Sequence, residues 1–184
     1  MTRRSAANLE RLAAGLLSRY CQSSRPPVDV EHIALELGIE VKCEPFEEDL
    51  SGVLVKQDGL TVIGVNSRHA ITRQRFTIAH EIGHFVLKHE GELFVDKTLR
   101  NQTAVVWRDG KSSLGTFACE VQANQFAAEL LMPRDVLIAE VEKRLERRGK
   151  SELDQLIREL ASSFKVSRQA MEYRLTNLGS LIPA

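Results

Sequence analysis

The sequence predicts an α+β fold in which a small antiparallel β-sheet packs on helices and a helix-turn-helix-like part stands at the C-terminal end. Three observations favour this class. The 184 residues are 43% hydrophobic and 27% charged, which suits one compact domain with a small appendage. Two β-branched runs flank an Asp-Gly pair, and several other segments place apolar residues at helical spacing. We therefore expect one unit over residues 1–148 and the helix-turn-helix-like part, packed on it, over 149–184.

Helices are predicted wherever apolar residues recur with the period of a helix. We expect them at residues 4–20, 30–37, 72–89, 117–132 and 134–148, and twice between 151 and 178. Gly38 is a good C-terminal stop for the second helix, and Pro133 forces a break after the long apolar one.

Strands are predicted by a different pattern. Apolar and charged residues alternate from 39 to 46, as in a half-buried strand. The runs 52–57 and 60–65 are joined by an Asp-Gly pair, which favours a two-residue hairpin turn. We expect residues 93–97 to be extended and residues 101–116 to form a polar, glycine-punctuated loop.

Composition excludes several classes of protein. Lys and Arg number 25, as do Asp and Glu, so the chain lacks the positive surplus of a dedicated nucleic-acid or membrane-surface binder. Cys21, Cys43 and Cys119 are odd in number and widely spaced, which excludes a disulfide framework and a cysteine zinc site. No run approaches the roughly 20 apolar residues of a membrane span. We expect a cytoplasmic protein.

Residues 80–84 read His-Glu-Ile-Gly-His, an H-E-x-x-H pattern on a predicted helix. Residues four apart lie about 40° apart around a helix axis, so His80 and His84 face the same way and can hold one metal ion. Glu81 then sits near enough to act on a water molecule beside that ion. Apolar residues fill more than half the girth of this helix. The alternative is that its polar arc faces water and both histidines are solvated surface residues.

The next long apolar helix offers a third ligand. Relative to Glu120, the side chains of Gln122, Gln125 and Glu129 fall about 140° to 200° away and predict a solvent-facing stripe. Glu120 and Asn124 therefore point into the protein. A buried carboxylate needs a partner, and a cation is the natural one. A metal ion and a salt bridge to an arginine would both meet that need.

The remaining histidines lack this geometry. His89 falls about 180° from His80 around the helix, so we expect it at the helix end or on the surface. His69 and His32 have no partner at ligand spacing. Gly83 weakens a helix relative to alanine, which predicts a close-packed neighbour at that point.

In these residues the chain resembles the ImmA/IrrE-type metallopeptidases of bacteria and their mobile elements. The similarity spans about residues 27–180. It is carried by the segments 27–34, 51–66, 73–84, 120–133 and 166–179. The pairing of the third and fourth of these segments is quite specific.

The resemblance implies a zincin-like minimal metallopeptidase. By it, His80, His84 and Glu120 are the ligands of one Zn²⁺ ion, with Mn²⁺ as the alternative, and Glu81 is the catalytic carboxylate. The implied substrate is an Xre-type helix-turn-helix repressor, whose cleavage releases silenced genes. Residues 108–116 resemble a loop of the short family members and are a candidate wall of the substrate cleft.

A peptidase of this kind usually adds a donor for the oxyanion. The candidates are Tyr173, Arg174, Arg108 and His69, and the sequence does not choose among them. For substrate binding, we expect an exposed strand of the 52–65 hairpin to pair with the substrate backbone.

The alternative function is a regulator that binds DNA or a repressor without proteolysis. Residues 151–178 resemble a helix-turn-helix whose second helix begins after Ser167. That helix carries Arg168, Gln169, Arg174 and Asn177. Residues 140–175, however, hold nine Lys or Arg against seven Asp or Glu, a surplus too thin for many phosphate contacts. We therefore expect no DNA binding by this chain alone.

Overall fold

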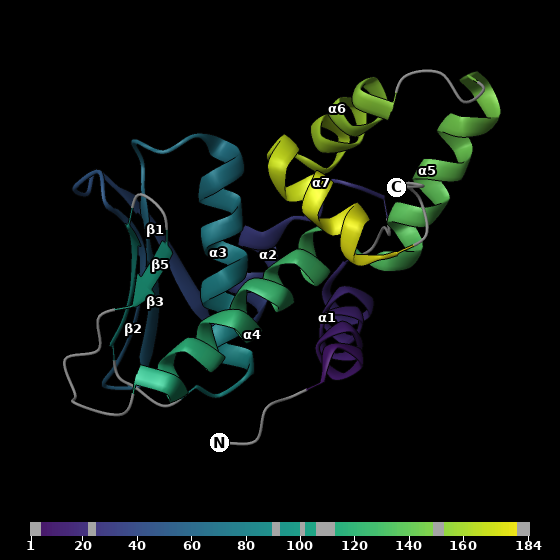
Figure 1. The fold of residues 1–184 in the computed structure, drawn as a ribbon. Helices are drawn as coiled ribbons and strands as arrows, with labels where there is room; N and C mark the ends of the chain where they lie inside the picture. The colour runs from purple at the N-terminus through teal and green to yellow at the C-terminus, as the bar shows by residue number, and fades with distance from the viewer. Residues whose placement is uncertain are drawn as a thin grey trace.

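The computed structural model describes residues 5–21, 25–89, 93–99, 102–105, 113–148 and 153–179. These residues form an α+β fold, as predicted. A sheet stands on one side, α3 (Ile71–Val86) lies against it, and α4 (Ser113–Leu131) packs on α3 and on α1; the C-terminal helices lie on the side away from the sheet (Figure 1). Leu54 and Ile63 of the sheet, Ile82 of α3 and Phe126 of α4 are fully buried in one continuous core.

The predicted helices are all present. Besides α3 and α4, they are α1 (Ala6–Tyr20), α2 (Val30–Glu36), α5 (Arg134–Arg148), α6 (Leu153–Phe164) and α7 (Arg168–Asn177). Gly38 follows α2 with φ +74°, the left-handed conformation of a helix stop. Two boundaries differ from expectation: α3 ends before Leu87, and α4 begins at Ser113, inside the predicted loop.

The sheet has five strands in the order β1-β3-β2-β4-β5. Their bounds are β1 (Ile39–Glu44), β2 (Leu50–Gln57), β3 (Leu60–Asn66), β4 (Leu93–Leu99) and β5 (Gln102–Val105). The hairpin of β2 and β3 is confirmed, and both turn residues, Asp58 and Gly59, have positive φ, as a type I′ turn requires. The β5 strand lies where we expected a loop.

The expectation of an antiparallel sheet was wrong for one pair, because β1 runs parallel to β3. The hairpin occupies one edge of β3, so β1 takes the other edge, and the chain crosses the end of β3 to enter β2. The buried Asn66 holds that crossing: its Nδ2 donates to the carbonyls of Glu47 (3.0 Å) and Leu50 (2.8 Å). Its Oδ1 accepts from the amides of Phe46 and Arg68.

The topology also overturns the expectation that the hairpin binds a substrate strand. β2 is paired with β3 and β4, and β3 is paired with β1 and β2, so neither has a free edge. The edges among the described strands are β1 and β5.

Two arginines fasten the C-terminal helices to the rest of the fold. Arg75 of α3 donates to the carbonyl of Lys165, between α6 and α7, and to that of Val28. Arg174 of α7 forms a buried ion pair with Glu129 of α4. The division of the chain at residue 148 stays a prediction.

Candidate metal centre

The H-E-x-x-H residues lie in the interior. His80, Glu81 and His84 expose 2%, 1% and 1% of their surface, because α3 is enclosed by the sheet on one side and α4 on the other. The interpretation of both histidines as solvated surface residues is therefore wrong.

Glu120 of α4 meets both histidines. Its Oε2 lies 3.2 Å from Nε2 of His80 and its Oε1 lies 2.9 Å from Nε2 of His84, while the two Nε2 atoms are 3.0 Å apart. Glu120 is also buried, as expected. The salt bridges that the described residues show for this carboxylate are to the two histidines, not to an arginine. His80, His84 and Glu120 form a group whose ligand atoms all lie within 4.8 Å of one another.

Gly83 sets how closely the two helices approach. A Cβ atom at this position would lie 3.1 Å from Phe126 Cδ1 and 3.3 Å from both Cα and O of Ala123. The close-packed neighbour predicted from Gly83 is therefore the backbone of α4, one turn from Glu120. A side chain at residue 83 would push apart the helices that carry the three ligand candidates.

These residues fit a zinc ion. Two imidazoles and one carboxylate are a common donor set for zinc, and bonds of about 2.0 Å in tetrahedral geometry place ligand atoms about 3.3 Å apart. The observed separations of 2.9 to 3.2 Å are close to that value. Among the described residues, neither carboxylate oxygen of Glu120 has a partner in hydrogen-bond geometry, although both are buried. A shared cation would satisfy all three side chains.

The charge states also suit a metal. Burial raises the pKa of Glu120, but the contacts with His80 and His84 outweigh it and hold that pKa at about 2. Burial lowers the pKa of His84, against the effect of the Glu120 contact. An ionised carboxylate and a neutral imidazole are the forms that bind metal ions.

Glu81 lies beneath β2. A Cβ atom at Gly52 would lie 3.7 Å from Oε1 of Glu81 and 2.2 Å from Cγ2 of Thr77, so only glycine lets the strand approach α3 this closely. Lys56, on the same face of β2, lies with its Nζ 5.4 Å from the ring centroid of Phe85. Burial lowers the pKa of Lys56, and the negative charge of Glu81 raises it.

Sequence reasoning missed Lys56. The signal was available, because Gly52, Leu54 and Lys56 alternate along one strand face and Leu54 is an obvious core residue. The strand pattern does not show which helix packs beneath that face, so it could not place Lys56 near Glu81 of α3.

His80 and His84 each contact a second polar side chain through the other ring nitrogen. Nδ1 of His80 lies 3.0 Å from Oδ1 of Asn124, and Nδ1 of His84 lies 3.0 Å from Nδ1 of His89. The inward orientation predicted for Asn124 is thereby explained. His89 follows the helix end, as one of the two expectations had it, but it is only 4% exposed and therefore not a surface residue.

The solvent stripe predicted on α4 is wrong. Gln122 and Glu129 are buried and Gln125 is half-buried, whereas Phe117 is exposed. The reason is that α4 is central: α3 covers one side of it, α1 packs on it, and Arg174 reaches Glu129 from α7. The inward orientation inferred for Glu120 is therefore correct, although the solvent-facing stripe from which it was inferred does not exist.

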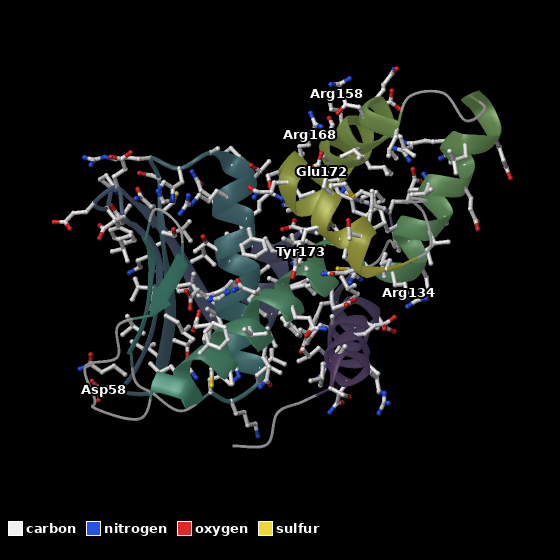
Figure 2. All side chains as sticks on the ribbon, viewed as in Figure 1. Asp58, Arg134, Arg158, Arg168, Glu172 and Tyr173 are labelled. Carbon is white, nitrogen blue, oxygen red and sulfur yellow. The ribbon has the colours of Figure 1, made fainter. Side chains whose placement is uncertain are left out.

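Of the four candidate oxyanion donors, three lie in the described part of the chain. Tyr173 is 68% exposed on α7 (Figure 2). Arg174 donates to Glu129 at 2.6 and 2.5 Å and to the carbonyl of Met132. Glu129 and Met132 lie at the C-terminal end of α4, about two and a half turns or more beyond Glu120. His69 precedes α3 and contacts the carbonyl of Glu48 at 3.2 Å. Arg108, like most of the 108–116 loop, lies outside the described residues.

Comparison with known families matches residues 34–176 to Peptidase_M78, described as the IrrE N-terminal-like domain. The chain belongs to this family. The family match covers α3 with its H-E-x-x-H residues, Glu120 and most of the C-terminal helices, so the ImmA/IrrE resemblance is confirmed. It makes the protein metallopeptidase-like in type.

Among solved structures, a protein described as a Mycobacterium tuberculosis transcriptional regulator is similar in fold, with a TM-score of 0.57 and 16% identity. The match covers 92% of this M78 chain and 46% of that one, so this chain spans about half the length of the regulator. No curated protein matches the chain. None of the helices in the described part has the length and hydropathy that crossing a bilayer requires.

Proposed function

We propose that this protein is a zinc-dependent endopeptidase. The observation that carries the proposal is the convergence of His80 Nε2, His84 Nε2 and the Glu120 carboxylate from two helices, with Glu81 beside them. Membership of the M78 family supports the same reaction class.

The residues divide into two roles. His80, His84 and Glu120 would hold the ion, which would polarise the scissile carbonyl and lower the pKa of a water molecule. Glu81 takes a proton from the attacking water and returns it to the leaving amine. The Lys56 ammonium, of opposite charge, stabilises the ionised carboxylate of Glu81.

We further propose that the substrate is an Xre-type helix-turn-helix repressor, cut in the cytoplasm to derepress genes. Support comes from the resemblance to ImmA/IrrE-type peptidases. The rival, a DNA-binding regulator, is disfavoured by the charges on α7, the helix that would read the DNA. Arg168 pairs with Asp154 and Glu172, and Arg158 pairs with Asp154 (Figure 2). Arg174 is buried, so it is removed from any DNA surface.

Metal analysis tests the ligands. The purified chain is expected to carry one Zn²⁺, measured by elemental mass spectrometry; a stoichiometric preference for Mn²⁺ would change the ion assigned. The variants His80→Ala and Glu120→Ala should lose it, while Glu81→Gln keeps it. Retention of full metal by either alanine variant removes that residue from the site.

Cleavage tests the reaction. The zinc-loaded chain is incubated with a purified Xre-type repressor, and fragments are followed by electrophoresis. We expect cleavage by the wild type and a loss of about 10²-fold or more in Glu81→Gln, because the proton acceptor is removed. Equal cleavage by both contradicts the mechanism. Absence of cleavage by either contradicts the assigned substrate.

A further inference from the structure

His89 contacts the ring of His84, and the way in which α3 ends brings it there. Leu87 is the C-cap, Lys88 adopts the left-handed conformation with φ +54°, and the amide of His89 donates to the carbonyl of His84 at 3.1 Å. This bond, from the second residue after the cap back to the third before it, is that of a Schellman motif. It turns the chain back so that residue 89 lies over residue 84.

In most Schellman motifs these two positions make an apolar contact. Here both are histidines, and their Nδ1 atoms lie 3.0 Å apart in the interior. At such a distance one nitrogen donates and the other accepts. The helix end therefore supplies a specific hydrogen bond to a metal-ligand candidate.

The direction of that bond follows from the other nitrogen of His84. Its Nε2 lies 2.9 Å from Glu120 and 3.0 Å from Nε2 of His80, in the ligand cluster. A histidine that binds a metal through Nε2 carries its proton on Nδ1, and the partner of that proton fixes the tautomer and the ring orientation. His89 must then accept through Nδ1.

We propose that His89 is the positioning residue of His84: it accepts the Nδ1–H bond and so fixes Nε2 as the metal-binding atom. The inference rests on the proposed zinc site. It extends the ligand pattern to H-E-x-x-H followed by four residues and a histidine that supports the second ligand. Asn124 faces Nδ1 of His80 in the same way, so each histidine has its own support.

Zinc affinity of the full-length chain tests the proposal, measured by competition with a chromophoric chelator. We expect His89→Leu to weaken zinc binding about 10- to 100-fold, as loss of such partners typically does. His89→Asn should recover most of the affinity, because its amide oxygen occupies the place of Nδ1 and can accept the same bond. The matched control is Lys88→Gly, which keeps the turn and should bind zinc like the wild type.

The outcomes separate this proposal from the proposed function. If the wild type binds no zinc, both fail. If His80→Ala loses zinc while His89→Leu retains wild-type affinity, the zinc site stands and the role of His89 is refuted. If His89→Asn is no better than His89→Leu, His89 is only a packing residue.

A second measurement needs no variant. Long-range proton–nitrogen NMR correlations of the zinc-loaded wild type should show His84 protonated at Nδ1 and His89 unprotonated at Nδ1. The opposite tautomer pair overturns the proposal.

Discussion

Replacement of Arg174 should destabilise the protein strongly without touching the chemistry. In the structure its guanidinium makes two contacts of 2.6 and 2.5 Å with the Glu129 carboxylate and one of 3.1 Å with the carbonyl of Met132. Both charged side chains are nearly inaccessible to water. The variant Arg174→Ala leaves a buried carboxylate without its counter-charge, which costs about 3 to 5 kcal/mol. For a chain of this size, that corresponds to a fall in Tm of about 6 to 20 °C.

Urea and thermal unfolding followed by circular dichroism measure the effect. The control is Arg168→Ala, whose ion pairs with Asp154 and Glu172 are exposed and should contribute little. The double variant Arg174→Met with Glu129→Leu should recover most of the stability, because an apolar pair of similar volume removes the unpaired charge. The reasoning fails if Arg174→Ala costs no more than the control, or if the double variant is no more stable than Arg174→Ala.

The same double variant distinguishes a structural arginine from a catalytic one. If Arg174 is structural, as its contacts with Glu129 and Met132 indicate, the stable double variant keeps its peptidase activity. If it stabilises the oxyanion, kcat should fall by 10²-fold or more although the fold is intact.

Two glycine substitutions probe the packing around the site. Gly83→Ala should weaken zinc binding and lower Tm, because its methyl group meets the α4 backbone. The control is Gly15→Ala in α1, where nothing lies within 4 Å, and it should raise the free energy of unfolding by up to about 1 kcal/mol. A Gly83→Ala variant more stable than the wild type would contradict the close approach of the two helices. Gly52→Ala should reduce activity because its Cβ would clash with Cγ2 of Thr77, and adding Thr77→Ser, which deletes that methyl, should restore much of it. Failure of the rescue would show that Thr77 is not the obstacle.

Local signals predicted most of the fold. The Asp-Gly turn, the stop at Gly38 and the break at Pro133 act within a few residues, so the sequence reveals them directly. Strand partners are different, because the choice of β3 by β1 depends on which edges the hairpin leaves open. That choice depends on contacts across the sheet, so the residues of β1 alone do not predict that it runs parallel to β3.

The ligand candidates were predictable for a related reason. His80 and His84 occupy one helix face by spacing alone, and Glu120 is conspicuous in an apolar helix. Glu129 shows the limit of that logic. Its helical angle grouped it with Gln122 and Gln125 in a solvent-facing stripe, yet its partner Arg174 lies 45 positions away in sequence. A charged residue can be buried when a remote counter-charge meets it, and helical angles do not contain that information.

His89 exposes a further limit, which concerns geometry more than pairing. A helical wheel places it opposite His80 only if α3 continues, and α3 ends before the left-handed Lys88. Lysine is seldom found in that conformation, so nothing in the residue types predicts the turn. Once the chain has turned back, the same five-residue spacing that seemed to exclude His89 brings its Nδ1 to 3.0 Å from that of His84. Residue types thus identify the candidate ligands of the proposed metal site, whereas the side chain that contacts His84 from behind depends on where the helix ends.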